Sequence, residues 1–202
     1  MNVYVESNFV LELAFEQEQH QFCQEVLELC DEKKVNLILP AYCLAEPLEK
    51  IVRQARDRSD LQKSLNTVLL QLSRTSSYAS RLNSIQDIES LLVQSNEEEK
   101  QRFARLRDRL VNVAEIIPLT LDTIREAAMC EATYDLTPQD AIVFASVITH
   151  LRQNGSSPSC FLNRNSKDFD NPDIVTELSK SGCKMIPRFD NGVAYIQSCL
   201  RT

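Results

Sequence analysis

The sequence contains very little glycine, with only three glycines in 202 residues, at positions 155, 182 and 192. Loops that cradle a phosphate with backbone amides, such as G-x-G-x-x-G and G-x-x-x-x-G-K-[ST], need closely spaced glycines. No two of the three glycines fit either spacing. Nucleotide binding by either type of loop is therefore excluded.

Long apolar runs and paired cysteine motifs are also missing. The longest apolar run, at residues 141–148, is far shorter than the ~18 residues that span a bilayer. The first residues carry no basic stretch of the kind that begins a secretory signal. The seven cysteines form no C-x-x-C, and with two histidines they argue against a structural zinc site. We expect no membrane association, reduced thiols and a cytoplasmic location.

The charge is unevenly distributed along the chain. The formal net charge of −7 alone disfavours a nucleic-acid partner, because phosphate contacts need lysine and arginine. Residues 47–109 nevertheless carry a net charge of +3, which leaves −10 for the rest of the chain. Their basic residues gather in two groups, one containing Arg53 and Arg56 and the other containing Arg105. These groups are either solvated helix faces or part of a binding surface.

Short apolar segments alternate with helical patterns. Such alternation with few hairpin turns favours parallel strands joined by right-handed crossover helices. We predict an α/β fold, a three-layer α/β/α sandwich with a mainly parallel sheet, as a single domain over residues 1–202. Strands are expected at 2–5, 35–40, 115–119, 159–163 and 183–187. Helices are expected at 6–15, 17–34, 40–47, within 48–110, and at 121–133, 136–154 and 172–181.

An α-helical insertion is expected at about residues 48–110. The pattern there is helical almost throughout, and a Ser/Thr-rich break at 73–77 predicts a hairpin of two long helices. Pro47 is expected to interrupt or kink the helix that leads into this insertion.

Acidic and amide side chains follow the expected strands. In open α/β sheets ligands gather at the carboxyl ends of the strands. Carboxylates that converge there repel one another unless a cation lies between them, and oxygen ligands suit Mg²⁺ or Mn²⁺. This pattern favours metal-assisted phosphodiester hydrolysis. The candidates are Glu6, Glu46, Asp140 and Asp168, with Asn165 beside them.

Each candidate also has a purely structural interpretation. Asp140, three residues after the expected N-cap Thr137, stabilises a helix start whatever the function. Glu46 is otherwise a solvated helix residue, and Asp168 a loop carboxylate. Glu6 lies between two apolar runs, where an unpaired carboxylate is costly.

Four segments occur in the chain order ESNFVLEL, LPAYCLAEPL, LTPQDAIVFASVI and CFLNRNSKDF. Together they resemble a PIN domain, the nuclease domain of bacterial VapC-type toxins and their relatives. The segment DAIVFASVI after a T-P turn is similar to the family motif D-A-x-x-x-A-x-A. The string N-x-N-x-x-D-F is similar to T-x-[DN]-x-x-[DE]-F. The resemblance covers residues 1–48 and 112–190 and leaves out the insertion.

The resemblance implies a metal-dependent ribonuclease acting on single-stranded or structured RNA. It puts Glu6, Glu46, Asp140 and Asp168 at the acidic Mg²⁺ or Mn²⁺ positions, and Asn165 where the family often has Asp or Asn. Ser7 falls at a hydroxyl position beside the metal. Many members pair with an antitoxin-type protein or form homodimers. Arg53, Arg56 and Arg105 are then candidates for holding the RNA backbone, with a dimer or partner interface as the competing interpretation.

Departures from the family pattern keep other functions open. Glu6 stands where the family usually has Asp, Asn163 stands where Thr or Ser is usual, and Asn165 removes one possible charge. The large helical insertion is a further difference. A catalytically silent PIN-like protein that acts as a binding or scaffold module is therefore the alternative to the enzyme. An unrelated α/β protein, whose acids are only caps and loop charges, is a third hypothesis.

Overall fold

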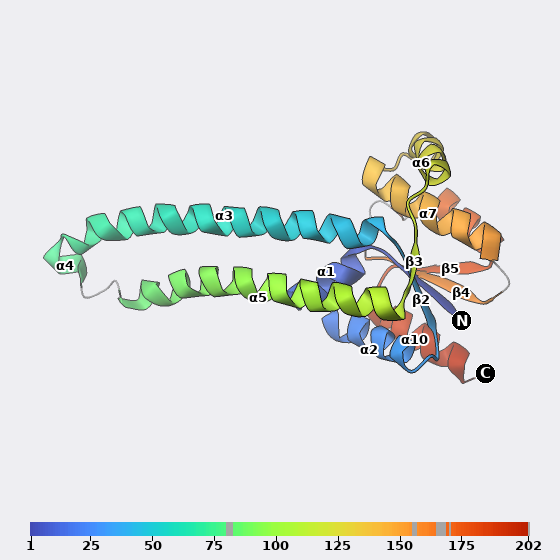
Figure 1. Cartoon of the computed structure of the whole chain (residues 1–202), viewed down its shortest axis with the longest axis horizontal. Coiled ribbons are helices and arrows are strands. Elements are labelled where there is room, and N and C mark those ends of the chain that lie inside the picture. The colour runs from blue at the N-terminus through green and yellow to red at the C-terminus, as the bar shows by residue number, and fades with distance from the viewer. Residues whose placement is uncertain (80–82, 155–156, 165–168, 170, 202) are drawn as a thin grey trace. The chain divides into compact units, whose positions relative to one another are not determined.

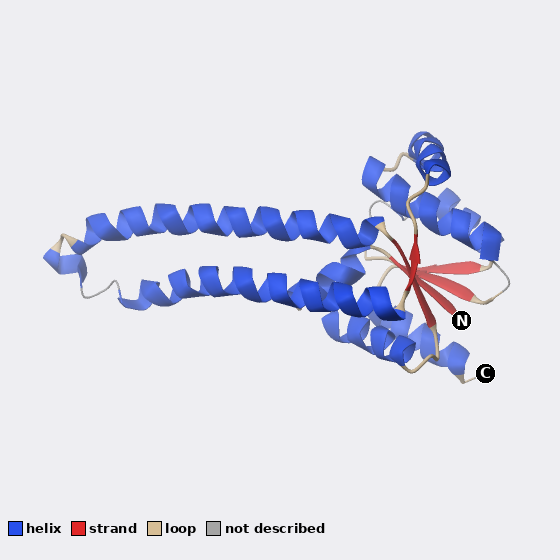
Figure 2. Ribbon diagram, viewed as in Figure 1, coloured by secondary structure: helices blue, strands red, loops and turns tan. Residues whose placement is uncertain are grey.

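A computed structural model describes residues 1–202 apart from 80–82, 155–156, 165–168, 170 and 202. Its centre is a five-stranded parallel sheet in the order β3-β2-β1-β4-β5 (Figures 1 and 2). The register places Val3 opposite Leu37 on one side and opposite Cys160 on the other. The predicted α/β class and parallel pairing are confirmed. The strands are β1 (Asn2–Val5), β2 (Asn36–Pro40), β3 (Glu115–Ile117), β4 (Ser159–Leu162) and β5 (Cys183–Ile186).

Helices cover both faces of this sheet, so the central strands read as nearly continuous apolar runs. One layer contains α1 (Ser7–Phe15), α2 (His20–Asp31) and α10 (Phe189–Leu200) (Figure 2). The other contains α6 (Leu121–Tyr134), α7 (Pro138–Asn154) and α9 (Pro172–Lys180). Aromatic rings fill both interfaces.

Those rings pack edge to face, which is a favoured geometry for buried aromatic pairs. Phe9 and Phe189 lie 5.7 Å apart between their centroids in the first layer. Phe161 and Phe169 lie 5.6 Å apart in the second. The contact of Phe9 with Phe189 joins α1 to α10, two helices that are distant in sequence.

The strand order creates a switch point between β1 and β4. After β1 the chain builds β2 and β3 on one side, and then returns to place β4 and β5 on the other. The helices that follow β1 and β4 cover opposite faces of the sheet, and in open α/β sheets a ligand-binding crevice is expected at the carboxyl ends of two such strands. Ligands of such sheets bind in that crevice.

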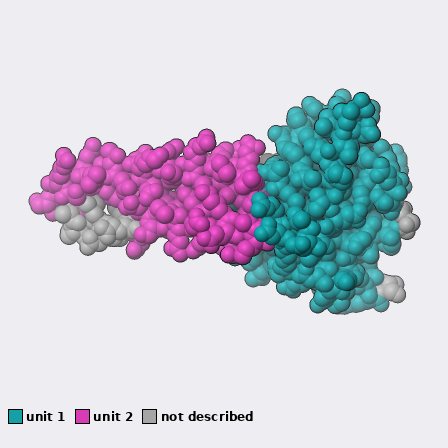
Figure 3. All heavy atoms as spheres, viewed as in Figure 1, with its two compact units in different colours: residues 1–47, 106–202 teal, residues 48–105 magenta. Residues whose placement is uncertain are grey.

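A second compact unit comprises Leu48–Arg105 (Figure 3). It contains most of α3 (Tyr42–Ser73), the short α4 (Ser76–Ala79) and most of α5 (Asn83–Val113). The break after Ser73 agrees with the Ser/Thr-rich segment. Within the unit, Arg58 donates two hydrogen bonds to the Glu99 carboxylate, at 2.7 and 2.9 Å.

Pro47 does not end the helix in which it lies. α3 continues past it to Ser73, so the expected interruption is wrong. Pro47 is only six residues into α3. Its missing N–H costs a single bond close to the helix start, and the long helical sequence beyond outweighs that loss.

All seven cysteines are free thiols, and all but Cys199 are buried. In the part of the chain that the structure describes, no helix has the length and apolarity needed to cross a membrane.

Candidate functional site

Glu6 follows β1 directly and caps the start of α1. Its Oε2 accepts a hydrogen bond from the backbone N–H of Asn8 at 2.7 Å. Its Oε1 accepts one from the backbone N–H of Arg164 at 3.2 Å. Because Arg164 lies just past β4, the Glu6 carboxylate joins the ends of the two strands that flank the switch point. The side chain is buried, with 4% of the residue exposed.

Glu46 reaches the same place from α3. Its Oε2 accepts a hydrogen bond from the hydroxyl of Ser7, the first residue of α1. β1 and β2 are parallel neighbours, so the helices that follow them begin at the same edge of the sheet. Three residues that the sequence singled out, Glu6, Ser7 and Glu46, therefore lie together.

Burial dominates the electrostatics of this group. It raises the pKa of Glu6, the nearby Glu46 carboxylate adds a smaller increase and the two backbone N–H bonds oppose the shift, for a net pKa of about 7. Burial also raises the pKa of the Cys43 thiol, and the charges of Glu6 and Glu46 add to that effect. The thiol stays protonated, so Cys43 is no nucleophile here.

Asp140 lies at the same edge of the sheet, in the first turn of α7. A short connection joins the end of α7 to the start of β4, so α7 begins on the carboxyl side of the strands (Figure 1). The predicted cap is confirmed: Thr137 Oγ1 accepts from the Asp140 backbone N–H at 3.3 Å and donates to Asp140 Oδ2 at 2.5 Å. Asp140 is half-buried.

The remaining candidates lie outside the described residues or in the second unit. Asn165 and Asp168 lie outside the described residues. Arg53, Arg56 and Arg105 are exposed side chains of the second unit. Among the residues that are described, no three His, Cys, Asp or Glu side chains are arranged around a common metal position.

Arg164 is the contact that sequence reasoning missed. Its backbone holds Glu6, and its guanidinium forms ion pairs with Glu12 and, at 2.9 Å, with Glu18. Glu12 could have indicated this contact from the sequence, because it is a carboxylate within the apolar segment FVLELAF of α1. A buried carboxylate needs a cation or hydrogen-bond donors, and Arg164 follows a strand end that faces the same crevice.

A family model described as PIN domain matches residues 3–169. The chain belongs to the PIN domain family. The match includes the helical segment that the motif resemblance left out, and it ends before α9, β5 and α10. No curated protein matches the chain with significant similarity.

PIN domains are generally nucleases, which are hydrolases that act on nucleic acid, and they generally use divalent metals. The unrelated α/β protein is therefore excluded. Within this family, the junction of Glu6, Ser7 and Glu46 lies at the carboxyl edge, where substrate and metal are expected.

Proposed function

We propose that this PIN domain is a metal-dependent endoribonuclease that hydrolyses RNA phosphodiester bonds at its acidic residues. One observation carries the proposal: Glu6 and Glu46, from the ends of neighbouring strands, are joined through Ser7 at the carboxyl edge of the sheet. Carboxylates that repel each other in a buried place gain stability when a cation is bound.

The donor chemistry of this place fits Mg²⁺ or Mn²⁺. The residues supply carboxylate oxygens, which are the ligands that hard divalent ions prefer. The raised pKa of Glu6 reflects burial and the neighbouring Glu46 charge, and a bound cation relieves both. When bound, the ion supplies an activated water molecule and stabilises the charge that develops on the phosphate. Glu6 and Glu46 would hold it, and Asp140, Asp168 and Asn165 would complete the ligand set directly or through water, because the described residues place no three acidic side chains around one metal position.

The protein's own residues contribute orientation and charge. Ser7 holds the Glu46 carboxylate, and the N–H groups of Asn8 and Arg164 hold Glu6. Asp140 is held by Thr137 at a helix start, where the helix dipole favours its negative charge. Arg53, Arg56 and Arg105 would contact the RNA backbone, because guanidinium groups bind phosphate in a fixed geometry.

Cleavage of a labelled single-stranded RNA pool tests the proposal, with Mn²⁺ or with EDTA. We expect cleavage by the natural protein in Mn²⁺ and its loss in Asp140→Asn. Asp122→Asn is the matched control, because Asp122 also lies in the first turn of a helix, but in α6. Equal cleavage by all three proteins, or by none, would favour the catalytically silent binding module instead.

Protein partners follow from the same proposal. A VapC-like member would bind an antitoxin-type protein or form a homodimer. Sedimentation of the purified chain measures self-association directly, and a monomer at all concentrations would remove the homodimer.

A further inference from the structure

Glu12 of α1 is a carboxylate that lies entirely inside the protein, with an exposed fraction of 0%. Its Oε2 accepts a hydrogen bond from the backbone N–H of Gln19 at 2.7 Å. Its Oε1 forms an ion pair with Nη1 of Arg164. A buried carboxylate requires such a countercharge, because desolvation of an unpaired ion is very unfavourable. The Arg164 side chain is thus tied to the interior of α1.

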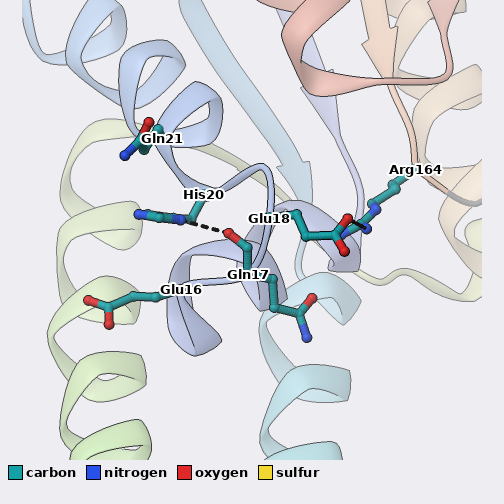
Figure 4. A pocket seen from close by; sticks show the side chains of 6 residues that line it. All are labelled: Glu16, Gln17, Glu18, His20, Gln21 and Arg164. Carbon is teal, nitrogen blue, oxygen red and sulfur yellow. Dashed lines mark hydrogen bonds and ion pairs between the residues drawn. The ribbon is translucent and has the colours of Figure 1, made fainter.

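The same arginine touches two more carboxylates. Its backbone N–H donates to Glu6 Oε1 at 3.2 Å, and its Nη2 lies 2.9 Å from Glu18 Oε2 at the surface (Figure 4). The Glu18 side chain is 84% exposed, whereas that of Glu12 is 1% exposed. Solvent screens the Glu18 pair, so the Glu12 pair is the one that anchors Arg164.

Two contacts hold the backbone at Arg164, one through the preceding residue and one through the Arg164 side chain. The preceding residue, Asn163, donates its N–H to the carbonyl of Ile186 in β5 at 3.0 Å. The side chain of Arg164 then ends in the ion pair with Glu12. Between these two anchors lies the N–H that binds Glu6, so its direction follows from both of them.

We propose that Arg164 is a positioning residue: its buried ion pair with Glu12 fixes the backbone N–H that orients the Glu6 carboxylate for metal binding. This inference rests on the proposed function of the Glu6 site and adds Glu12 and Arg164 to it. Both act through Glu6, in the way that hydrogen-bond partners of metal ligands set ligand orientation.

The test compares Glu12→Gln with Glu18→Gln, because each removes one carboxylate paired with Arg164. Three quantities are measured: hydrogen exchange of the Arg164 amide, Mn²⁺ affinity by calorimetry, and kcat and KM for RNA. In Glu12→Gln we expect roughly tenfold faster exchange, roughly tenfold weaker Mn²⁺ binding and a lower kcat at unchanged KM. In Glu18→Gln all three should stay within about twofold of the natural protein, since that pair is screened by solvent.

A second comparison guards against misfolding. Arg164→Met alone leaves the buried Glu12 carboxylate without its countercharge and is expected to destabilise the fold. The double variant Glu12→Gln/Arg164→Met removes both charges, so it is the informative variant. The double variant should remain folded and bind Mn²⁺ as weakly as Glu12→Gln does. Arg164→Lys should bind Mn²⁺ more tightly than either of these variants, although more weakly than the natural protein. Unchanged amide exchange in Glu12→Gln, or equal effects in Glu18→Gln, would overturn the positioning role. A natural protein that neither binds Mn²⁺ nor cleaves RNA would overturn the proposed function, and the exchange comparison still decides the positioning role.

Discussion

The hydroxyl of Ser7 donates a hydrogen bond to Oε2 of Glu46, which joins the start of α1 to the first turns of α3. Both helices follow neighbouring parallel strands, and Ser7 stands next to Glu6 in sequence. A single hydroxyl therefore fixes Glu46 relative to the strand end that carries Glu6.

Ser7→Ala tests this relationship. A hydrogen bond to a charged group contributes about 1.5–3 kcal/mol, so loss of Glu46 orientation should lower the rate of RNA cleavage roughly ten- to hundredfold. The matched control is Ser146→Ala, which removes a buried hydroxyl that donates to the Ile142 carbonyl inside α7. Single-turnover kinetics should show slower cleavage only in Ser7→Ala. Equal rates in both variants would contradict a role for Ser7 at the site.

The raised pKa of Glu6 predicts how stability depends on pH in EDTA. The pKa is about 7 in the folded protein against an ordinary value of 4.5, so the folded state binds the proton more tightly. The unfolding free energy should therefore fall as pH rises from about 4.5 to 7, by about 3 kcal/mol from this group, and should level off above.

Glu6→Gln removes that contribution. Its unfolding free energy, measured with urea at pH 5 and pH 8, should change less than that of the natural protein. Its absolute stability is a poor guide, because an amide has one oxygen while Glu6 accepts from two N–H groups. An identical difference between the two pH values in both proteins would show that Glu6 ionises normally.

The sheet and its helices were largely predictable because the strands are short apolar runs and the helix starts have strong caps. Thr137, Pro138 and Asp140 specify the start of α7 through local chemistry, and the structure agrees. The last helix, α10, was missed, although Phe189, Val193 and Ile196 have helical spacing and are buried. No cap side chain marks its start at Arg188, so its boundary depends on packing against β4 and β5.

Only part of the site follows from sequence. Strand ends bring Glu6 and Glu46 to one edge, because parallel strands end together. The contact from Arg164 uses its backbone N–H, which every residue except proline possesses, so residue type could not reveal it. The parallel pairing of β1 with β4 decides that contact, because it brings the residues that follow the two strands together.

Two substitutions at the N-terminal cap of α7 distinguish an effect on stability from an effect on catalysis. Thr137→Ala removes the hydroxyl that accepts from the Asp140 N–H, which should lower the unfolding free energy by about 1 kcal/mol. Asp140→Asn should cost only about 0.3–1 kcal/mol, through the helix dipole, but abolish cleavage. Thermal melts and cleavage assays on both variants measure the two effects. Retained cleavage in Asp140→Asn would leave Asp140 as a capping residue only.

A buried chain of hydrogen bonds away from this edge provides a further test. Tyr4 Oη lies 2.8 Å from His150 Nδ1, and His150 Nε2 lies 2.9 Å from Glu115 Oε1. Burial raises the pKa of Tyr4, so its hydroxyl stays protonated and serves as the hydrogen-bond partner of His150 Nδ1. Tyr4→Phe should lower the unfolding free energy by about 1–3 kcal/mol, because the buried Nδ1 loses that partner.

Cleavage by Tyr4→Phe should be unchanged at temperatures where it is folded. His150 is ten residues after Asp140 in α7, roughly 15 Å along the helix. A cleavage defect without loss of stability would connect this chain of hydrogen bonds to the site.

RNA binding by the second unit is tested by its salt dependence. The variant with Arg53, Arg56 and Arg105 all changed to Gln should bind single-stranded RNA more weakly, measured by fluorescence anisotropy in EDTA with Asp140→Asn as background. Each phosphate contact on a single strand contributes about 0.7 to the slope of log affinity against log salt, so three lost contacts should reduce it by about 2. The control is Arg58→Gln: Arg58 is engaged by Glu99, and its loss should destabilise the hairpin while leaving the slope unchanged. An unchanged slope in the triple variant would show that these arginines do not hold RNA and would favour a protein interface on this unit.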